Sequence, residues 1–284
     1  MTERIIFVAD FFANQIKGGG ELNDWELISL LRDNGSEVET WNSNQIRADI
    51  VKKWISSGCK FIISNFVSLS GECRDLIAEH GDYVICEHDH KYLESRNPMD
   101  YPDFKAPPDK IINREFYSNA KAVFCQSGFH VGIVRKNLEI DNLVNLSGNL
   151  WSNYHLEILE DMSKVEKDDS YAVINYPIPH KNVEEAIRYC KYKDLKFNII
   201  DLCSPQDFLK KLGKNGTLVF FPQSPETLSR IVVESRMMGM KTRTTKNIGA
   251  VHEPWFAEKG IDLIKIMREK RNSIPALFLE KLDG

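Results

Sequence analysis

A run of glycines near the N-terminus is the first group of residues with chemistry suited to a ligand. Gly18, Gly19, Gly20 and Glu21 stand between a predicted strand at 4–10 and a predicted helix at 20–34. Glycine lets the backbone approach a ligand closely, and the free N–H groups at a helix N-terminus attract phosphate. Because the run is neither G-x-G-x-x-G nor a P-loop, a phosphate site and a flexible strand–helix turn explain it equally well.

Two acidic residues and a lysine form a second set in the C-terminal half. Glu226 and Glu234 are separated by seven residues, and Glu234 lies inside a predicted helix at 228–238. Carboxylates accept hydrogen bonds from sugar and ribose hydroxyls, although two solvated carboxylates explain the spacing alone more simply. Lys181 follows a predicted strand, where it either reaches a diphosphate or lies on the surface.

The segment Glu87, His88, Asp89 and His90 has the composition of a metal cluster. Adjacent residues at the end of a strand point to opposite faces, so all four cannot share one ion. No H-E-x-x-H frame is present, and we therefore expect no metal. One or two of these residues are expected to line an acceptor or sugar pocket, with a purely structural histidine as the alternative.

The elements that position these residues alternate between strand and helix. In the N-terminal half the hydrophobic spacing predicts helices at 20–34 and 46–57 and strands at 4–10, 38–41, 61–65, 83–87 and 122–126. Such alternation is typical of a parallel sheet, in which ligands bind beyond the carboxyl ends of the strands. The proline-rich stretch 90–108 is predicted to be a long functional loop.

The alternation resumes after a polar stretch at 149–167, which we interpret as a linker between two halves. Helices are predicted at 182–190, 206–212 and 228–238, and strands at 171–176, 197–201, 218–222 and 240–245. The tail at 254–282 is predicted to be helical with a break near Pro275. The pattern therefore predicts an α/β chain with two Rossmann-like domains.

Composition limits the classes of function. The 284 residues carry 37 Lys and Arg against 41 Asp and Glu, a net charge of −4, which disfavours a protein dominated by nucleic-acid binding. The six cysteines show no C-x-x-C spacing, so we expect reduced thiols. No signal peptide and no apolar run of about 18 residues are evident, and the expected location is the cytoplasm.

Taken in order, these motifs resemble the retaining glycosyltransferases of family 4, which have the GT-B fold. The matching residues are Gly18 to Glu21, Ser127 after the strand at 122–126, Leu146 to Asn149, Lys181-Asn182, Pro222 to Glu226 with Glu234, and Asn247 to Ala250. The resemblance implies an N-terminal acceptor-side domain at 1–150, joined by part of 262–284, and a C-terminal nucleotide-sugar domain at 151–261.

The resemblance also implies roles for individual residues. A UDP- or GDP-sugar would be the donor substrate, with no permanently bound cofactor and no metal. Lys181 and the start of the 228–238 helix, with Thr227 and Leu228, would hold the diphosphate together with the glycine run. Glu226 would bind sugar hydroxyls and Glu234 the ribose, while His88 and Asp89 would lie beside the acceptor.

Two alternatives remain open at the level of sequence. One is a transferase acting on hydroxymethylated DNA bases, for which Arg96, Tyr101 and Trp151 are candidate contacts. The other is a non-catalytic nucleotide-binding protein that kept the fold. The acceptor is accordingly a glycan, a small molecule or a DNA base.

Overall fold

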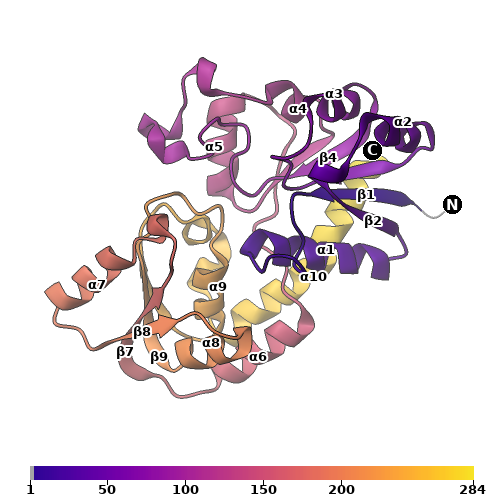
Figure 1. Ribbon diagram of the computed structural model, residues 1–284. Coiled ribbons are helices and arrows are strands. Elements are labelled where there is room, and N and C mark those ends of the chain that lie inside the picture. The colour runs from indigo at the N-terminus through magenta and orange to yellow at the C-terminus, as the bar shows by residue number, and fades with distance from the viewer. Residues whose placement is uncertain (1–2) are drawn as a thin grey trace. The chain divides into compact units, whose positions relative to one another are not determined.

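The computed structural model describes residues 3–284 and divides the chain into two compact units. Unit 1 holds the chain up to Leu150 together with Lys270–Gly284, and unit 2 is Trp151–Glu269. Both are α/β units built on parallel strands (Figure 1).

Unit 1 contains a six-stranded sheet in the order β2-β1-β3-β4-β5-β6, with every pair parallel. The strands are β1 (Arg4–Ala9), β2 (Glu37–Asn42), β3 (Lys60–Ile63), β4 (Asp82–Cys86), β5 (Ala122–Cys125) and β6 (Leu143–Asn145). The helices are α1 (Gly19–Asp33), α2 (Ala48–Ser56), α3 (Gly71–His80), α4 (Arg114–Ser118) and α5 (Gly128–Leu138), and the last turns of α10 (Ile261–Asp283) join them.

Alternate residues of each strand serve the two faces of this sheet. One set, including Ile6, Phe61 and Ile85, packs against α2 to α5. The other set, including Ile5 and Phe124, packs against α1 and the C-terminal part of α10 (Figure 1). Both faces are therefore covered by helices, as a buried parallel sheet requires.

Unit 2 contains a four-stranded parallel sheet in the order β10-β9-β7-β8. Its strands are β7 (Asp168–Asn175), β8 (Phe197–Asp201), β9 (Asn215–Phe220) and β10 (Lys241–Thr244). Helices α6 (Asn153–Ser163), α8 (Pro205–Leu212), α9 (Arg230–Met237) and the start of α10 cover one face, and α7 (Val183–Tyr192) covers the other.

In both sheets the order of the strands reverses once. After adding strands on one side of its first strand, the chain adds the later ones on the other side. These switch points lie between β1 and β3 in unit 1 and between β7 and β9 in unit 2. Ligands of open α/β sheets bind at the carboxyl ends of the strands beside such a point. The residues that follow these four strands are therefore the first candidates for function.

Two predictions about the chain's organisation are wrong. The stretch 149–167 is not a polar linker, because residues 153–163 form α6 and bury Leu156, Leu159 and Met162. The recurrence of those three residues at helical spacing is the signal that the charged neighbours obscured. The tail does not break near Pro275 either, because α10 continues through that residue to Asp283.

The loop predicted at 90–108 is irregular in the structure. It contains short 3₁₀ turns at Pro98–Asp100, Pro102–Phe104 and Pro108–Lys110. Five non-glycine residues from here to the start of α4 have positive φ: His90, Arg96, Asp103, Phe104 and Asn113. Left-handed non-glycine residues cost energy and concentrate at functional sites.

Candidate functional site

The glycine run opens α1 just beyond β1, beside the switch point of unit 1. Gly18 is the N-cap with an extended backbone and no side-chain cap, and Gly19 begins the helix. Glu21 folds back over Gly18, so that a Cβ at Gly18 would collide with its carboxylate. Burial raises the pKa of Glu21, and the Asp24 carboxylate adds to the rise. The absence of a side chain at Gly18 therefore makes room for the Glu21 carboxylate at the helix N-terminus.

His88 lies under this run rather than beside open solvent. A Cβ on Gly20 would stand 3.6 Å from the His88 ring, and the His88 side chain is 6% exposed. Its Nε2 is 2.8 Å from Asp24 Oδ1 and 3.5 Å from Cys86 Sγ. Its Nδ1 is 3.0 Å from Gln126 Nε2. Both ring nitrogens thus have protein partners, and the His88 side chain is held in place by Asp24, Cys86 and Gln126.

The electrostatics of His88 follow from these contacts. Burial disfavours the imidazolium, but the Cys86 thiol and the Asp24 carboxylate outweigh it and raise the pKa of His88 well above its ordinary value. Asp24 is completely buried and also accepts a hydrogen bond of 2.5 Å from Ser64 Oγ. Helix α1 and the ends of β3, β4 and β5 therefore meet at this one imidazole.

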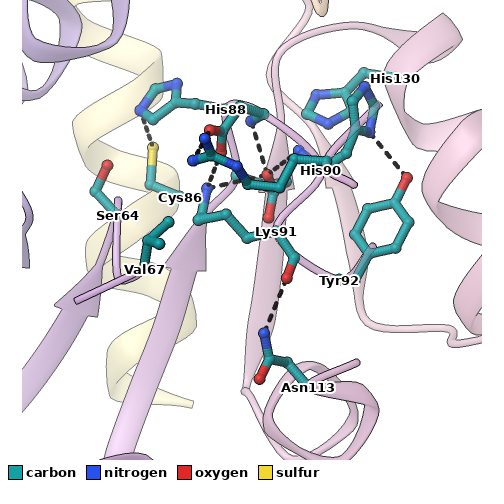
Figure 2. A network of polar contacts seen from close by, with 12 residues as sticks. Ser64, Val67, Cys86, His88, His90, Lys91, Tyr92, Asn113 and His130 are labelled. Carbon is teal, nitrogen blue, oxygen red and sulfur yellow. Dashed lines mark hydrogen bonds and ion pairs between the residues drawn. The ribbon is translucent and has the colours of Figure 1, made fainter. Parts of the chain in front are cut away.

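Glu87 joins a different group from its neighbour His88. Its carboxylate accepts hydrogen bonds from the backbone N–H groups of Asp89 and His90, from Lys91 Nζ at 3.1 Å and from the Tyr117 hydroxyl. Burial pushes the pKa of Glu87 up, yet the Lys91 ammonium and Tyr117 hold it at about 2. Glu87 and Lys91 are both almost fully buried, so this ion pair supports the segment that carries His88. Figure 2 shows Lys91 within the polar network of this segment.

Asp89 is the accessible member of the segment. Its side chain is 43% exposed and pairs with Lys91 at 2.9 Å and Arg96 at 3.2 Å. Burial raises the pKa of Asp89, but the two cations lower it further than burial raises it, and the carboxyl remains ionised. Asp89 therefore presents a fixed negative charge at the edge of unit 1, on the residue before the left-handed turn at His90.

In unit 2 the structure brings Lys181 and Glu226 together at the switch point. Lys181 Nζ is 2.6 Å from Glu226 Oε1, and it lies 5.8 Å and 5.7 Å from the ring centres of Tyr176 and Phe220. Lys181 follows β7 and Glu226 follows β9. The backbone of Glu226 exchanges hydrogen bonds with Asn247 and Gly249, which fixes the carboxylate in place. A half-buried ion pair therefore marks the edge of this sheet.

Glu234 is buried within its own cluster of partners. It accepts a hydrogen bond of 2.8 Å from Trp151 Nε1 and pairs with His155 at 3.2 Å and Arg230 at 3.7 Å. Burial raises the pKa of Glu234, but His155 and Arg230 lower it overall. Burial first, and then the charges of Glu226 and Glu234, raise the pKa of the Tyr176 phenol.

The remaining predicted residues lie between these groups. Thr227 is half-buried, whereas Leu228 is completely buried, so only the backbone of Leu228 can serve a ligand. Ser229 caps α9 with a left-handed backbone, and its buried hydroxyl has no hydrogen-bond partner. Ser229 and Arg230 were not predicted from the sequence, although Arg230 stands one helical turn before Glu234.

Other residues of these clusters also escaped prediction. Asp24, Cys86 and Gln126 in unit 1 and Tyr176 in unit 2 have no motif of their own, and Trp151, proposed above as a contact for DNA bases, is buried against Glu234. Their positions after strands or on the inner face of α1 are the only sequence signal for them. Within residues 3–284 no helix is long and apolar enough to cross a membrane.

Comparison with solved structures gives matches along nearly the whole chain. Sucrose-phosphate synthase from Thermosynechococcus elongatus is 9% identical with a TM-score of 0.58, covering 99% of this chain and 98% of that one. A glycosyltransferase from Rickettsia africae ESF-5 is 16% identical with a TM-score of 0.52, covering 99% and 96%. HepE from Anabaena in complex with UDP is 13% identical with a TM-score of 0.50, covering 97% and 95%.

No protein-family model matches the chain, and a sequence comparison with curated proteins gives no match either. At identities this low, likeness of structure speaks for the fold alone. The fold is that of two Rossmann-like domains of the GT-B class, with the C-terminal helix contributing to the first domain. The predicted fold class is therefore confirmed.

Proposed function

We propose that this protein is a glycosyltransferase that moves a sugar from a nucleotide-sugar donor to an acceptor hydroxyl, with retention of configuration, as the resemblance to family 4 implies. The observation that carries the proposal is the Lys181–Glu226 pair at the switch point of unit 2. A cation and a carboxylate held together there match a ligand that has both phosphate and hydroxyl groups.

Each donor group has a proposed partner in unit 2. Lys181 binds the diphosphate, together with the backbone N–H groups of Thr227 and Leu228 and the unpartnered hydroxyl of Ser229. Glu226 accepts hydrogen bonds from the sugar hydroxyls. Glu234, whose Oε1 contacts Trp151 and Arg230, accepts hydrogen bonds from the ribose hydroxyls in this proposal.

The glycine run supplies a phosphate-binding element in unit 1. Gly18, Gly19 and Gly20 offer the first N–H groups of α1, and Glu21 sits beside them. A helix N-terminus attracts anions through these N–H groups and through the helix dipole. These four residues are the proposed phosphate-binding residues of unit 1.

The proposed acceptor side lies at the carboxyl edge of the unit 1 sheet. Asp89 is exposed enough to touch an acceptor hydroxyl, and His88 positions the segment from below. Basic residues of the neighbouring loop pair with carboxylates, Arg96 with Asp89 and Lys110 with Glu94. These pairings leave less charge for phosphodiester contacts, and we favour a glycan or small-molecule acceptor over a DNA base.

The chemistry needs charge stabilisation more than a reactive side chain. The bond between the anomeric carbon and the phosphate oxygen breaks, a bond to the acceptor oxygen forms, and the leaving phosphate takes the acceptor's proton. Negative charge grows on that phosphate, where Lys181 and the N–H groups of unit 2 are proposed to lie. Removing one such preorganised donor typically lowers the rate by a factor of about 100 to 1000.

Calorimetric titration with UDP and with GDP tests the donor site directly. UDP comes first because HepE, a structural neighbour, was solved with it. We expect Lys181→Ala to weaken nucleoside diphosphate binding at least about tenfold, since it removes the charge that faces the phosphates. Lys265→Ala is the matched control, because Lys265 forms an exposed ion pair with Asp262 in the same unit.

The results of these assays distinguish the proposed transferase from the two alternatives. Binding of neither nucleotide to the folded protein, or equal effects of Lys181→Ala and Lys265→Ala, would remove the donor site from unit 2. Tight binding without hydrolysis or transfer of any nucleotide sugar would instead favour the non-catalytic alternative. Transfer to an oligonucleotide with hydroxymethylated bases, but not to sugars, would restore the DNA alternative.

A further inference from the structure

Three side chains with different metal-binding chemistry meet beneath the first turns of α1. Asp24 comes from the helix, and Cys86 and His88 come from the end of β4. Among the residues that the structure describes, theirs is the one group of His, Cys and carboxylate side chains with all ligand atoms within 4.8 Å of one another. We propose that Asp24, Cys86 and His88 bind a divalent transition metal ion of the zinc class.

Two of the three distances between the ligand atoms, those from Cys86 Sγ, fit a tetrahedral ion. With Zn–S, Zn–N and Zn–O distances of about 2.3, 2.1 and 2.1 Å, sulfur should lie about 3.6 Å from the nitrogen and from the oxygen. Cys86 Sγ lies 3.5 Å from His88 Nε2 and 3.9 Å from Asp24 Oδ1. The two distances from the thiol therefore need little adjustment.

The third distance reflects a hydrogen bond that the ion would replace. His88 Nε2 and Asp24 Oδ1 are 2.8 Å apart, whereas two ligands of one tetrahedral ion stand about 3.4 Å apart. Exchange of the shared proton for the ion requires an opening of about 0.6 Å, which a side-chain rotation of His88 supplies. On binding, Cys86 releases its thiol proton and His88 carries its remaining proton on Nδ1.

The groups around the three residues already support such a ligand set. Gln126 stands 3.0 Å from His88 Nδ1, and a half-turn of its amide presents the oxygen that accepts the Nδ1 proton. Ser64 Oγ donates to the second oxygen of Asp24. Metal-bound histidines and carboxylates are oriented by outer hydrogen bonds of this kind.

The arrangement does not suit a cysteine nucleophile. In a nucleophile–base–carboxylate triad the two partners use opposite nitrogens of the histidine. Here Cys86 and Asp24 both face Nε2, so His88 cannot take a proton from the thiol while Asp24 orients its other nitrogen. Convergence of sulfur, nitrogen and oxygen on one point is the geometry of a metal site, and the thiolate favours zinc over magnesium.

Cobalt substitution tests the site without any nucleotide sugar, so its outcome is independent of the proposed transferase activity. The full chain carrying Cys203→Ser, which removes the exposed cysteine, is freed of metal and given one equivalent of Co²⁺. We expect a thiolate-to-cobalt charge-transfer band in the near ultraviolet, the visible bands of a tetrahedral site, and the loss of both when Zn²⁺ is added.

Variants assign the ligands. Cys86→Ser should abolish the charge-transfer band, and Asp24→Asn should weaken Zn²⁺ binding at least about tenfold. Cys73→Ser is the control, because Cys73 is a buried cysteine of the same unit whose thiol donates to the Ile46 carbonyl instead. Thermal unfolding with and without Zn²⁺ shows whether each variant is folded, and only the Cys73→Ser protein should keep the full stabilisation by zinc.

Two results would overturn the proposal. One is the absence of a charge-transfer band in the folded parent protein. The other is a band, or a zinc-induced stabilisation, that persists unchanged in a folded Cys86→Ser or Asp24→Asn protein. If Cys86→Ser does not fold, Cys86→Ala and His88→Gln carry the same test.

Discussion

Acid should destabilise unit 1 through a pair of buried histidines. His90 and His130 are 3% and 0% exposed, and their rings stand edge to face with centres 5.0 Å apart (Figure 2). His90 Nδ1 bonds to the Tyr92 hydroxyl at 2.9 Å, and Gln126 N–H donates to His130 Nδ1. Both Nε2 atoms are buried without a hydrogen-bond partner, so the imidazolium form of either ring would leave at least one N–H without an acceptor.

The size of this loss of stability follows from the pKa shift of His90. Burial lowers the pKa of His90 from 6.5 to about 4, although Glu87 and Asp89 oppose the change. Burial, with His90 next, also lowers the pKa of His130 well below its ordinary value. At about 1.36 kcal/mol for each pKa unit, His90 alone accounts for about 3 kcal/mol of stability.

The direction is set by which state binds the proton. In the unfolded chain this imidazole takes up a proton below about pH 6.5, whereas in the folded protein it does so only near pH 4. The stabilisation is therefore complete above pH 6.5 and is lost progressively as the pH falls to 4. His88 acts in the opposite direction: its raised pKa stabilises the fold fully below about pH 6.5, and this contribution is lost as the pH rises, so it does not explain a loss of stability in acid. Its contribution is the same in both proteins compared below.

The assay compares the wild-type chain with His90→Asn between pH 7 and 4. Asparagine is chosen because His90 has a φ of 61° and asparagine tolerates this left-handed backbone. Amide hydrogen exchange in β4 and β5 gives the opening free energy of unit 1, which a chain of two units need not share with unit 2. We expect the variant to lose about 3 kcal/mol less than the wild type across this range. Parallel curves for the two proteins would refute the assignment.

Three further outcomes are expected for the proposed transferase. Glu234→Gln should weaken UDP binding at least about tenfold by calorimetry while keeping an acceptor for Trp151 Nε1; unchanged affinity in the folded variant would remove Glu234 from the site. Turnover should not depend on added Mg²⁺, because in the proposed site Lys181 and backbone N–H groups supply the positive charge for the diphosphate; a rate that requires the ion would contradict this role of Lys181. Proton NMR of fresh product should show the donor's anomeric configuration, and an inverted product would promote Asp89 to general base, because His90 is buried and only Asp89 is exposed enough to reach an acceptor.

The order of elements could be predicted from the sequence because its signals are local. Runs such as Ile5 to Ala9 and Tyr83 to Cys86 are apolar and β-branched, and every strand predicted from such runs is a strand in the structure. The start of α1 at the glycine run and the burial of Cys86 and Cys125 also follow from neighbouring residues. The α/β class therefore needs no knowledge of the tertiary structure.

The errors arose where distant residues decide the outcome. The polar residues of 149–167 favour a linker, whereas the sheet face that buries Leu156 and Leu159 is formed by strands further along the chain. Pro275 predicts a break, but α10 packs along unit 1 through Ile274 and Phe278. Tertiary burial on both sides of a proline compensates for the hydrogen bond that it removes.

The candidate sites also have one part that could be predicted from local sequence and one part that distant residues decide. From the sequence alone, Lys181 and Glu226 could be placed after strands of one parallel sheet, and the structure pairs them at 2.6 Å at that edge. The sequence could not determine the partners of His88, because Asp24 lies 64 residues earlier on a helix whose inward face is set by packing on the sheet. Which side chains converge on one point depends on the register and rotation of packed elements, and these are fixed only when the core is complete.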